Sequence, residues 1–166
     1  MIEVGSTVIG GLLLAFIFFV FRDFIFKLPA LSGLWRFESE TQSTSYNPYR
    51  GMQLTYLVLL WQEGPAIYGS GEKVREDVNG AVRTYTGAQR SRIEIRGDLT
   101  KRYLARSEVV LHFNEHSESR QSSTMQTLKL EGRGKMSGTF ASTVANSSGT
   151  TRWKLGADGL TFEGLV

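Results

Sequence analysis

The chain has 166 residues, with 19 Lys or Arg and 16 Asp or Glu, which gives a formal net charge of +3. This mildly basic balance permits an anionic ligand or a lipid headgroup contact, whereas duplex nucleic acid usually requires a denser basic stripe. The sequence contains no cysteine, which excludes disulfides, thiol catalysis and zinc–thiolate sites.

The N-terminal segment is the most apolar part of the chain. Residues 4–21 carry no charged side chain, and roughly 20 helical residues cross a hydrocarbon core about 30 Å thick. The apolar character continues at Phe24, Ile25 and Phe26, beyond Arg22 and Asp23. We therefore expect a single transmembrane helix, with residues 1–28 as an anchor and residues 29–166 as one compact domain.

Two other interpretations of this segment are open. A cleaved secretory signal normally begins with basic residues, but only Glu3 precedes the apolar run. The small residues at Ala30 and Ser32 nevertheless favour a cleavage site. A buried core helix is the third interpretation, although so small a chain would rarely bury a helix that is apolar on every face.

The charges that flank the apolar segment indicate its orientation. Arg22, Lys27 and Arg36 follow it, whereas Glu3 precedes it. Lys and Arg favour the cytoplasmic side of a membrane, so we expect the C-terminal domain in the cytoplasm. Gly11 and Ala15 have the spacing that permits close packing of membrane helices, although glycine is also common in such helices in general.

After Pro29 the sequence is typical of β-strands. Val109, Leu111 and Phe113 alternate with their neighbours at the period of a half-buried strand. Asn79-Gly80 is a strong hairpin signal. The strand-like runs are residues 35–39, 52–62, 66–75, 92–96, 108–113, 124–130, 136–144 and 151–155.

These runs predict an all-β fold of about eight strands joined by short loops, which is best stabilised by closing into a barrel without edges. We therefore expect an eight-stranded antiparallel β-barrel, which is large enough to hold one small ligand. The strand glycines Gly69, Gly71 and Gly138 fit sharp bends of a barrel. A two-sheet sandwich is the alternative.

The sequence gives little support to catalysis. His112 and His116 are its only histidines, and they fall in a strand and turn where solvated surface positions are expected. Neither a Gly-x-Ser-x-Gly elbow nor an HExxH motif occurs. We therefore predict a protein that is not an enzyme, with no metal site and no cofactor.

Aromatic and cationic side chains on the predicted strands favour a ligand with bases and phosphates. Aromatic rings stack on bases and guanidinium groups clamp phosphates. Lys73 and Arg75 are expected to share one face of their strand. In a barrel, however, exposed Lys and Arg are the ordinary composition of the outer face. The candidate ligand-binding residues are Tyr56, Tyr68, Lys73, Arg75, Arg92 and Arg152.

Two resemblances extend this interpretation. The segment Leu31-Ser32-Gly33-Leu34-Trp35 resembles the Gly-x-Trp opening of lipocalin-like barrels, in which the Trp plugs the closed end. With runs such as LTYLVLLWQEGPAIYGSGEK and KMSGTFASTVANSSGTTRW, the whole layout resembles the transmembrane, β-strand-rich effectors of bacterial cyclic-oligonucleotide antiphage signalling (CBASS). That family is often described with two membrane segments, whereas this sequence has room for one.

The resemblance to the antiphage effectors implies a specific function. A cyclic dinucleotide would bind the barrel in the cytoplasm, the protomers would form a homo-oligomer, and the clustered helices would disrupt the inner membrane. The alternatives are a membrane-tethered lipocalin-like carrier of a small apolar ligand and a structural subunit of a membrane complex. A carrier would need an apolar barrel interior.

Overall fold

The computed structural model describes residues 2–20, 27–102, 105–116 and 121–156. An N-terminal helix, α1 (Ile2–Val20), precedes the strands, and short 3-10 helices occupy connections at Asn47–Tyr49, Gly87–Gln89 and Val144–Asn146. The strands are β1 (Gly33–Ser43), β2 (Gln53–Glu63), β3 (Ala66–Val78), β4 (Ala81–Thr84), β5 (Arg92–Thr100), β6 (Glu108–His116), β7 (Gln121–Gly132), β8 (Lys135–Ser142) and β9 (Ser147–Leu155).

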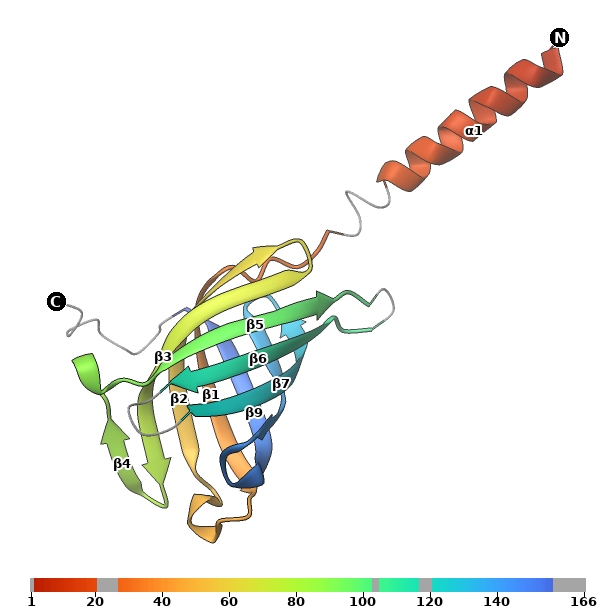
Figure 1. Cartoon of the computed structure of the whole chain (residues 1–166). Helices are drawn as coiled ribbons and strands as arrows, with labels where there is room; N and C mark the ends of the chain where they lie inside the picture. Colours follow the sequence, from red (N-terminus) through yellow and green to blue (C-terminus); the bar gives the residue numbers. More distant parts are fainter. Residues whose placement is uncertain (1, 21–26, 103–104, 117–120, 157–166) are drawn as a thin grey trace.

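The strands form a closed antiparallel barrel (Figure 1). Strand β1 pairs with both β2 and β9, and β2 pairs with β3, so that eight strands close without an edge. The predicted eight-stranded barrel is confirmed, and the sandwich is excluded.

Strand β4 lies outside the closed barrel and pairs with β3 alone among the described strands. It follows the predicted Asn79-Gly80 hairpin, whose two residues have positive φ angles of 53° and 88° as a tight hairpin turn requires.

One end of the barrel is filled by large apolar side chains. Trp35, near the start of β1, is 1% exposed, and its indole Nε1 donates a hydrogen bond to the carbonyl of Leu31 at 2.8 Å. Leu60, Ile67 and Met136 are buried in the same core. We refer to this as the closed end; the chain that leads to α1 enters the barrel here.

The interior becomes polar along the strands. On β1 the buried residues change from Trp35 and Phe37 to Ser39 and Thr41. Side chains two residues apart point to the same face of a strand, so all four of these residues face the barrel interior. The half of the barrel farther from α1 therefore has a lining that can form hydrogen bonds.

Gly138 permits β8 to pack tightly against β7. A Cβ atom at this position would overlap the carbonyl oxygen of Thr127 and crowd the Cα atom of Leu128 at 2.9 Å. The strand glycine is thus explained by a close backbone approach.

Helix α1 exposes its apolar side chains. Every side chain from Val8 to Phe19 is exposed, including Leu12 at 67% and Phe18 at 70%. Among the described residues, no helix has both the length and the apolar character required to cross a membrane. The predicted apolar segment ended at Phe21, and residues 21–26 lie outside the part of the chain that the structure describes.

Candidate ligand-binding cavity

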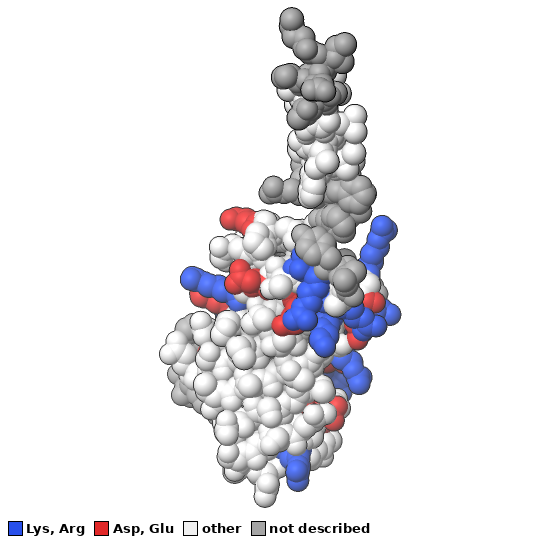
Figure 2. Space-filling view, turned by 90° about the vertical axis from the view of Figure 1, so that its right-hand side faces the viewer, with Lys and Arg blue, Asp and Glu red and all other residues white. Residues whose placement is uncertain are grey.

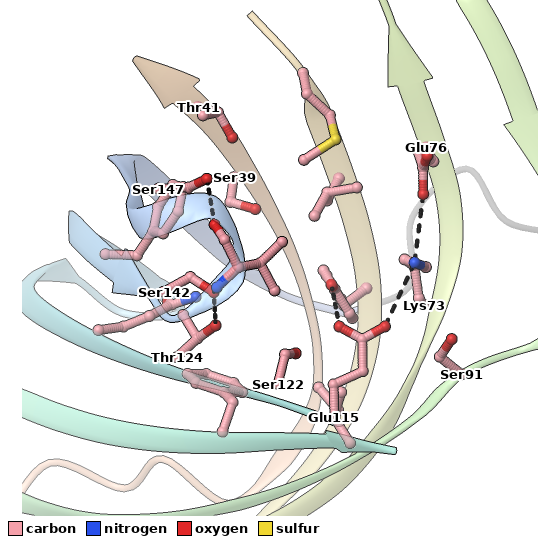
Figure 3. A pocket seen from close by; sticks show the side chains of 18 of the residues that line it. Ser39, Thr41, Lys73, Glu76, Ser91, Glu115, Ser122, Thr124, Ser142 and Ser147 are labelled. Atoms are coloured by element: carbon pink, nitrogen blue, oxygen red, sulfur yellow. Dashed lines mark hydrogen bonds and ion pairs between the residues drawn. The ribbon is translucent and has the colours of Figure 1, made fainter. Parts of the chain in front are cut away.

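A cavity of about 150 Å³ occupies the polar half of the barrel. Its walls come from all eight strands of the closed barrel, β1, β2, β3 and β5 to β9, together with residues of the connections at the open end (Figure 3). The mouth is bordered by Tyr49 and Met52, which lie in and after the β1–β2 connection, and by Val144 in the β8–β9 connection. The cavity therefore opens at the end of the barrel opposite to Trp35.

Aromatic rings form the inner end of the cavity. Phe37 stacks on Tyr56 with ring centroids 4.6 Å apart and on Trp153 with centroids 4.3 Å apart. Phe113 packs at an angle against Phe37 at 5.5 Å. The Trp153 indole donates a hydrogen bond to the side-chain oxygen of Gln126 at 2.9 Å, which satisfies its buried N–H. Of these rings, Phe37, Tyr56 and Phe113 line the cavity and form its aromatic floor, against which a planar ligand group could lie.

Hydroxyl groups line most of the remaining wall. A hydroxyl both donates and accepts hydrogen bonds, so such a wall suits a ligand with several polar groups. One pair is already satisfied internally, because Thr124 Oγ1 donates to Ser142 Oγ at 2.9 Å. The lining hydroxyls are those of Ser39, Thr41, Ser91, Ser122, Thr124, Ser142 and Ser147.

Lys73 is the charged centre of the cavity (Figure 3). Its Nζ lies 3.3 Å from Glu76 Oε2 and 3.4 Å from Glu115 Oε1. Tyr56 donates its hydroxyl hydrogen to Glu115 at 3.2 Å, and Tyr85 donates to Glu76 at 3.1 Å. Lys73 also lies 5.3 Å from the centre of the Tyr85 ring. We call Tyr56, Lys73, Glu76, Tyr85 and Glu115 the charged cluster.

A β-bulge brings Lys73 and Glu76 to the same side. Residues three apart on a regular strand point to opposite faces. In β3, however, Tyr56 pairs with Lys73 and Thr55 pairs with Arg75, so that Val74 is the additional residue of a bulge. As a result Lys73 and Glu76 both line the cavity, while Arg75 faces outwards. The expectation that Lys73 and Arg75 share one face was therefore wrong, because it assumed unbroken alternation.

The charged cluster alters the acidity of its members. Burial raises the pKa of Tyr56 well above its ordinary value of 10.0, and the neighbouring Glu115 carboxylate raises it further. Burial lowers the pKa of Lys73, but Glu115 and Glu76 raise it by more, so its pKa lies above the ordinary 10.5. Lys73 is therefore charged and Tyr56 neutral at physiological pH.

The six candidate residues lie in several places. Tyr56 and Lys73 line the cavity. Arg75 and Arg152 line a different hollow of about 200 Å³ on the outer face of β9, β1, β2 and β3. Tyr68 stacks on Trp61, with ring centroids 6.3 Å apart, and Arg92 is exposed at the start of β5. The structure brings Tyr56 together with Lys73 and Arg75 together with Arg152.

Several cavity residues were not predicted from the sequence. Glu115 continues the alternation of Val109, Leu111 and Phe113, so its inward direction could have been read from that pattern. Glu76 carried no such signal, because the bulge reverses the alternation of β3.

Nothing in the described ranges forms a group of three His, Asp or Glu residues suited to a metal ion. Comparison of the chain with protein-family models, with curated proteins and with solved structures found no match.

Proposed function

We propose that this chain is a membrane-anchored binding protein whose barrel takes up a small polar ligand. The observation that carries the proposal is the cavity at the open end, which combines an aromatic floor, hydroxyl walls and a charged cluster around Lys73. Ligand sites are typically concave and largely apolar, with a few convergent polar groups. The cavity of this barrel is concave and has convergent polar groups, but it is more polar than a typical site, which favours a polar ligand.

The N-terminal segment is the anchor in this proposal. Helix α1 has 19 residues, which corresponds to about 28 Å along its axis, and its side chains from Val8 to Phe19 are exposed and largely apolar. So large an exposed apolar surface requires a partner, and a bilayer is the partner that covers a helix on all sides. The sequence extends the apolar character to Phe26.

In this arrangement the barrel lies in the cytoplasm, at the inner membrane of a bacterium. Arg22, Lys27 and Arg36 follow the apolar segment, and such residues favour the cytoplasmic side. A C-terminal alkaline phosphatase fusion should then be inactive and a C-terminal fluorescent protein fusion bright. The reverse pattern would contradict this orientation.

The charges of the cavity favour a ligand that is neutral or positively charged. Among the described residues of the lining, Lys73 is the only cation, and Glu76 and Glu115 together outweigh it. Both carboxylates already hold the ammonium group, so little positive charge remains for a phosphate. A neutral planar ligand with several hydroxyl or amide groups would use the floor and the walls together.

The antiphage effector is the more specific form of the proposal. In that form a cyclic dinucleotide binds the barrel, the protomers form a homo-oligomer and the helices disrupt the inner membrane. The aromatic floor suits a base, and the phosphates would remain at the mouth, outside the negative interior. A ligand can drive assembly only if it binds the assembled state more tightly than the single protomer.

An apolar-ligand carrier is the second candidate. Phe37, Ile93, Phe113 and Phe140 supply apolar walls, and these residues favour it. The charged cluster opposes it, because an apolar ligand would strip water from Lys73 and the two carboxylates without replacing it.

Binding measurements on the full-length protein, dissolved in detergent, distinguish these forms of the proposal. Titration calorimetry should compare cyclic dinucleotides, neutral nucleosides and a fatty acid. Binding of a neutral nucleoside or of a cyclic dinucleotide would support the sensor, and the Lys73→Met variant should change the affinity. Binding of the fatty acid alone would favour the carrier hypothesis over the sensor hypothesis. If none of these ligands binds, the structural-subunit hypothesis is the one that remains.

A further inference from the structure

We propose that the closed end of the barrel docks on the surface of an anionic bilayer through an apolar collar and a cationic cluster. The collar consists of Leu34, Leu59, Trp61, Tyr68 and Leu155; the cluster consists of Lys27, Lys101, Arg102 and Arg106. This inference rests on the proposed anchor but extends it, because it assigns the barrel its own membrane contact.

The collar is an apolar surface on neighbouring strands, in which Leu155 occupies the exposed end of β9 and the other members lie on the outer face. Leu59 and Trp61 are 52% and 45% exposed, and Leu155 is 44% exposed. Leu34 pairs with Leu59 across β1 and β2. The carbonyl of Leu34 accepts a hydrogen bond from Gly156, the neighbour of Leu155, at 2.8 Å. These contacts link the collar across β9, β1 and β2.

Trp61 and Tyr68 complete the collar where β2 ends and β3 begins. The two residues pair across the strands, and their rings stack with an interplanar angle of 20°. Trp and Tyr are enriched at membrane interfaces, because an apolar ring and a polar group can occupy the boundary together. Their position beside the turn at Glu63 places both rings near the closed end.

The cationic cluster lies at the same end of the barrel. Figure 2 shows Lys and Arg side chains gathered where the barrel meets the helix, with Asp and Glu side chains among them, above a mostly uncharged lower part. Lys101 Nζ donates to the carbonyl of Lys27 at 2.8 Å, which joins the β5–β6 connection to the chain that leads to α1.

The arginines of the cluster are accessible to lipid phosphates. Arg102 and Arg106 have 52% and 66% exposed side chains and form ion pairs with Glu108 at 2.8 Å and Glu131 at 3.9 Å. Exposed ion pairs contribute little, so a lipid phosphate can compete for both guanidinium groups. Basic residues near anionic headgroups are attracted to them within a Debye length.

The length of the connection keeps this surface close to the bilayer. Lys27 follows Val20, the last residue of α1, by seven positions, and a fully extended chain covers at most about 25 Å over that length. An inserted α1 would therefore hold the closed end near the headgroups, and docking through the collar would leave the cavity mouth facing away from the membrane.

The tryptophans allow a direct test in the full-length protein. Trp35 and Trp153 are buried inside the barrel at 1% and 2% exposure, so Trp61 is the exposed tryptophan. The chain should be reconstituted into vesicles of phosphatidylcholine and phosphatidylglycerol, with and without brominated acyl chains, and its tryptophan fluorescence compared. Bromine should quench the wild type, and Trp61→Phe should remove most of that quenching.

Charge reversal supplies the second arm of the test. The double variant Arg102→Glu, Arg106→Glu should reduce quenching, since each basic residue lost lowers the docked-to-free ratio by roughly fivefold. Arg50→Glu, at the opposite end of the barrel, is the matched control and should leave quenching unchanged. Vesicles without phosphatidylglycerol should also give weaker quenching.

Flotation of the same vesicles separates the two possible failures. If the chain floats with the vesicles but Trp61 is not quenched, the anchor holds and docking is wrong; a collar buried between two copies of the chain would give this result. If the chain does not float, the anchor is wrong and docking is overturned with it.

Discussion

Lys73 remains charged inside the barrel because two carboxylates pair with its ammonium group. An ammonium group taken out of water costs several kcal/mol unless it is paired, and Glu76 and Glu115 supply the pairs at 3.3 and 3.4 Å. Tyr56 then uses Glu115 as its own acceptor. A ligand that enters the cavity meets charged and hydrogen-bonding groups whose positions are already set.

Stability should fall as the pH rises above about 10. Tyr56 and Lys73 both have pKa values raised above their ordinary 10.0 and 10.5, so the folded state retains protons that the unfolded chain releases. Their contribution is complete below the ordinary values and is lost as the pH rises through the raised ones. Thermal melts between pH 8 and about 11 should show a shallower decline for Tyr56→Phe; an unchanged slope would contradict the raised pKa of Tyr56.

Glu115→Gln tests the sign of the ligand's charge. The substitution keeps the shape of the side chain but leaves Lys73 paired with Glu76 alone. A neutral or cationic ligand should bind about 5- to 10-fold more weakly, because a charge-assisted hydrogen bond becomes a neutral one. Calorimetric titration of both proteins measures the change.

Glu94→Gln is the matched control, since Glu94 is exposed on the outer face of β5. It should leave the affinity unchanged. Tighter binding by Glu115→Gln would instead indicate an anionic ligand and would favour the cyclic-dinucleotide form of the proposal.

Strand β3 shows how far the alternation of apolar and polar residues alone predicts this barrel. The period-2 runs located the strands of the closed barrel, because half-buried strands must present one apolar face to the core. Lys73 was predicted as a ligand residue, but Glu76 was not, because the bulge at Val74 moves it to the inner face. Strand β4 was also missed: its four residues are all exposed, so they have no buried face to produce a pattern.

The candidate site was harder to predict for a related reason. Arg75 and Arg152 have the chemistry of phosphate ligands but face outwards into a separate hollow. The hydroxyl groups of Ser39 and Ser122 give no hydropathy signal that distinguishes a cavity wall from solvent. Side-chain type was visible in the sequence, whereas the direction of each side chain depended on register.

Gly138→Ala should destabilise the barrel. The added Cβ would overlap the carbonyl oxygen of Thr127 in the neighbouring strand, and overpacking typically costs about 1–3 kcal/mol. Chemical denaturation should therefore show a lower midpoint than for the wild type. Gly10→Ala in α1, where a Cβ meets nothing within 4 Å, should leave the midpoint unchanged, and equal midpoints for all three proteins would refute the close approach of β7 and β8.

In the proposed arrangement, the two ends of the whole molecule lie in different environments. The closed end, beside Trp35 and α1, faces the proposed membrane, while the cavity mouth at Tyr49 and Val144 opens on the other side. A soluble ligand could then reach the cavity while the helix stays inserted. Ligand binding and membrane action would be separable functions of one chain.

Growth arrest should require both parts of the chain if the effector form is correct. Deletion of residues 1–28 removes the membrane-active segment and should abolish growth arrest while ligand binding remains. Gly11→Leu should reduce dye entry into cells without changing affinity, because a bulky side chain keeps helices apart. Growth arrest by the truncated protein would exclude membrane disruption.

The most direct measurement is the ligand-induced rise in melting temperature of two neighbouring variants. Ser122 is 9% exposed and lines the cavity, whereas Ser123 is exposed on the outer face. Ligand at 100 times its Kd stabilises a native protein by about 2.7 kcal/mol. The Ser122→Phe side chain should fill the cavity, so this variant should show no ligand-induced rise in melting temperature. The Ser123→Phe variant should retain the rise. An equal rise in both variants would show that the ligand binds elsewhere and would contradict the proposed binding cavity.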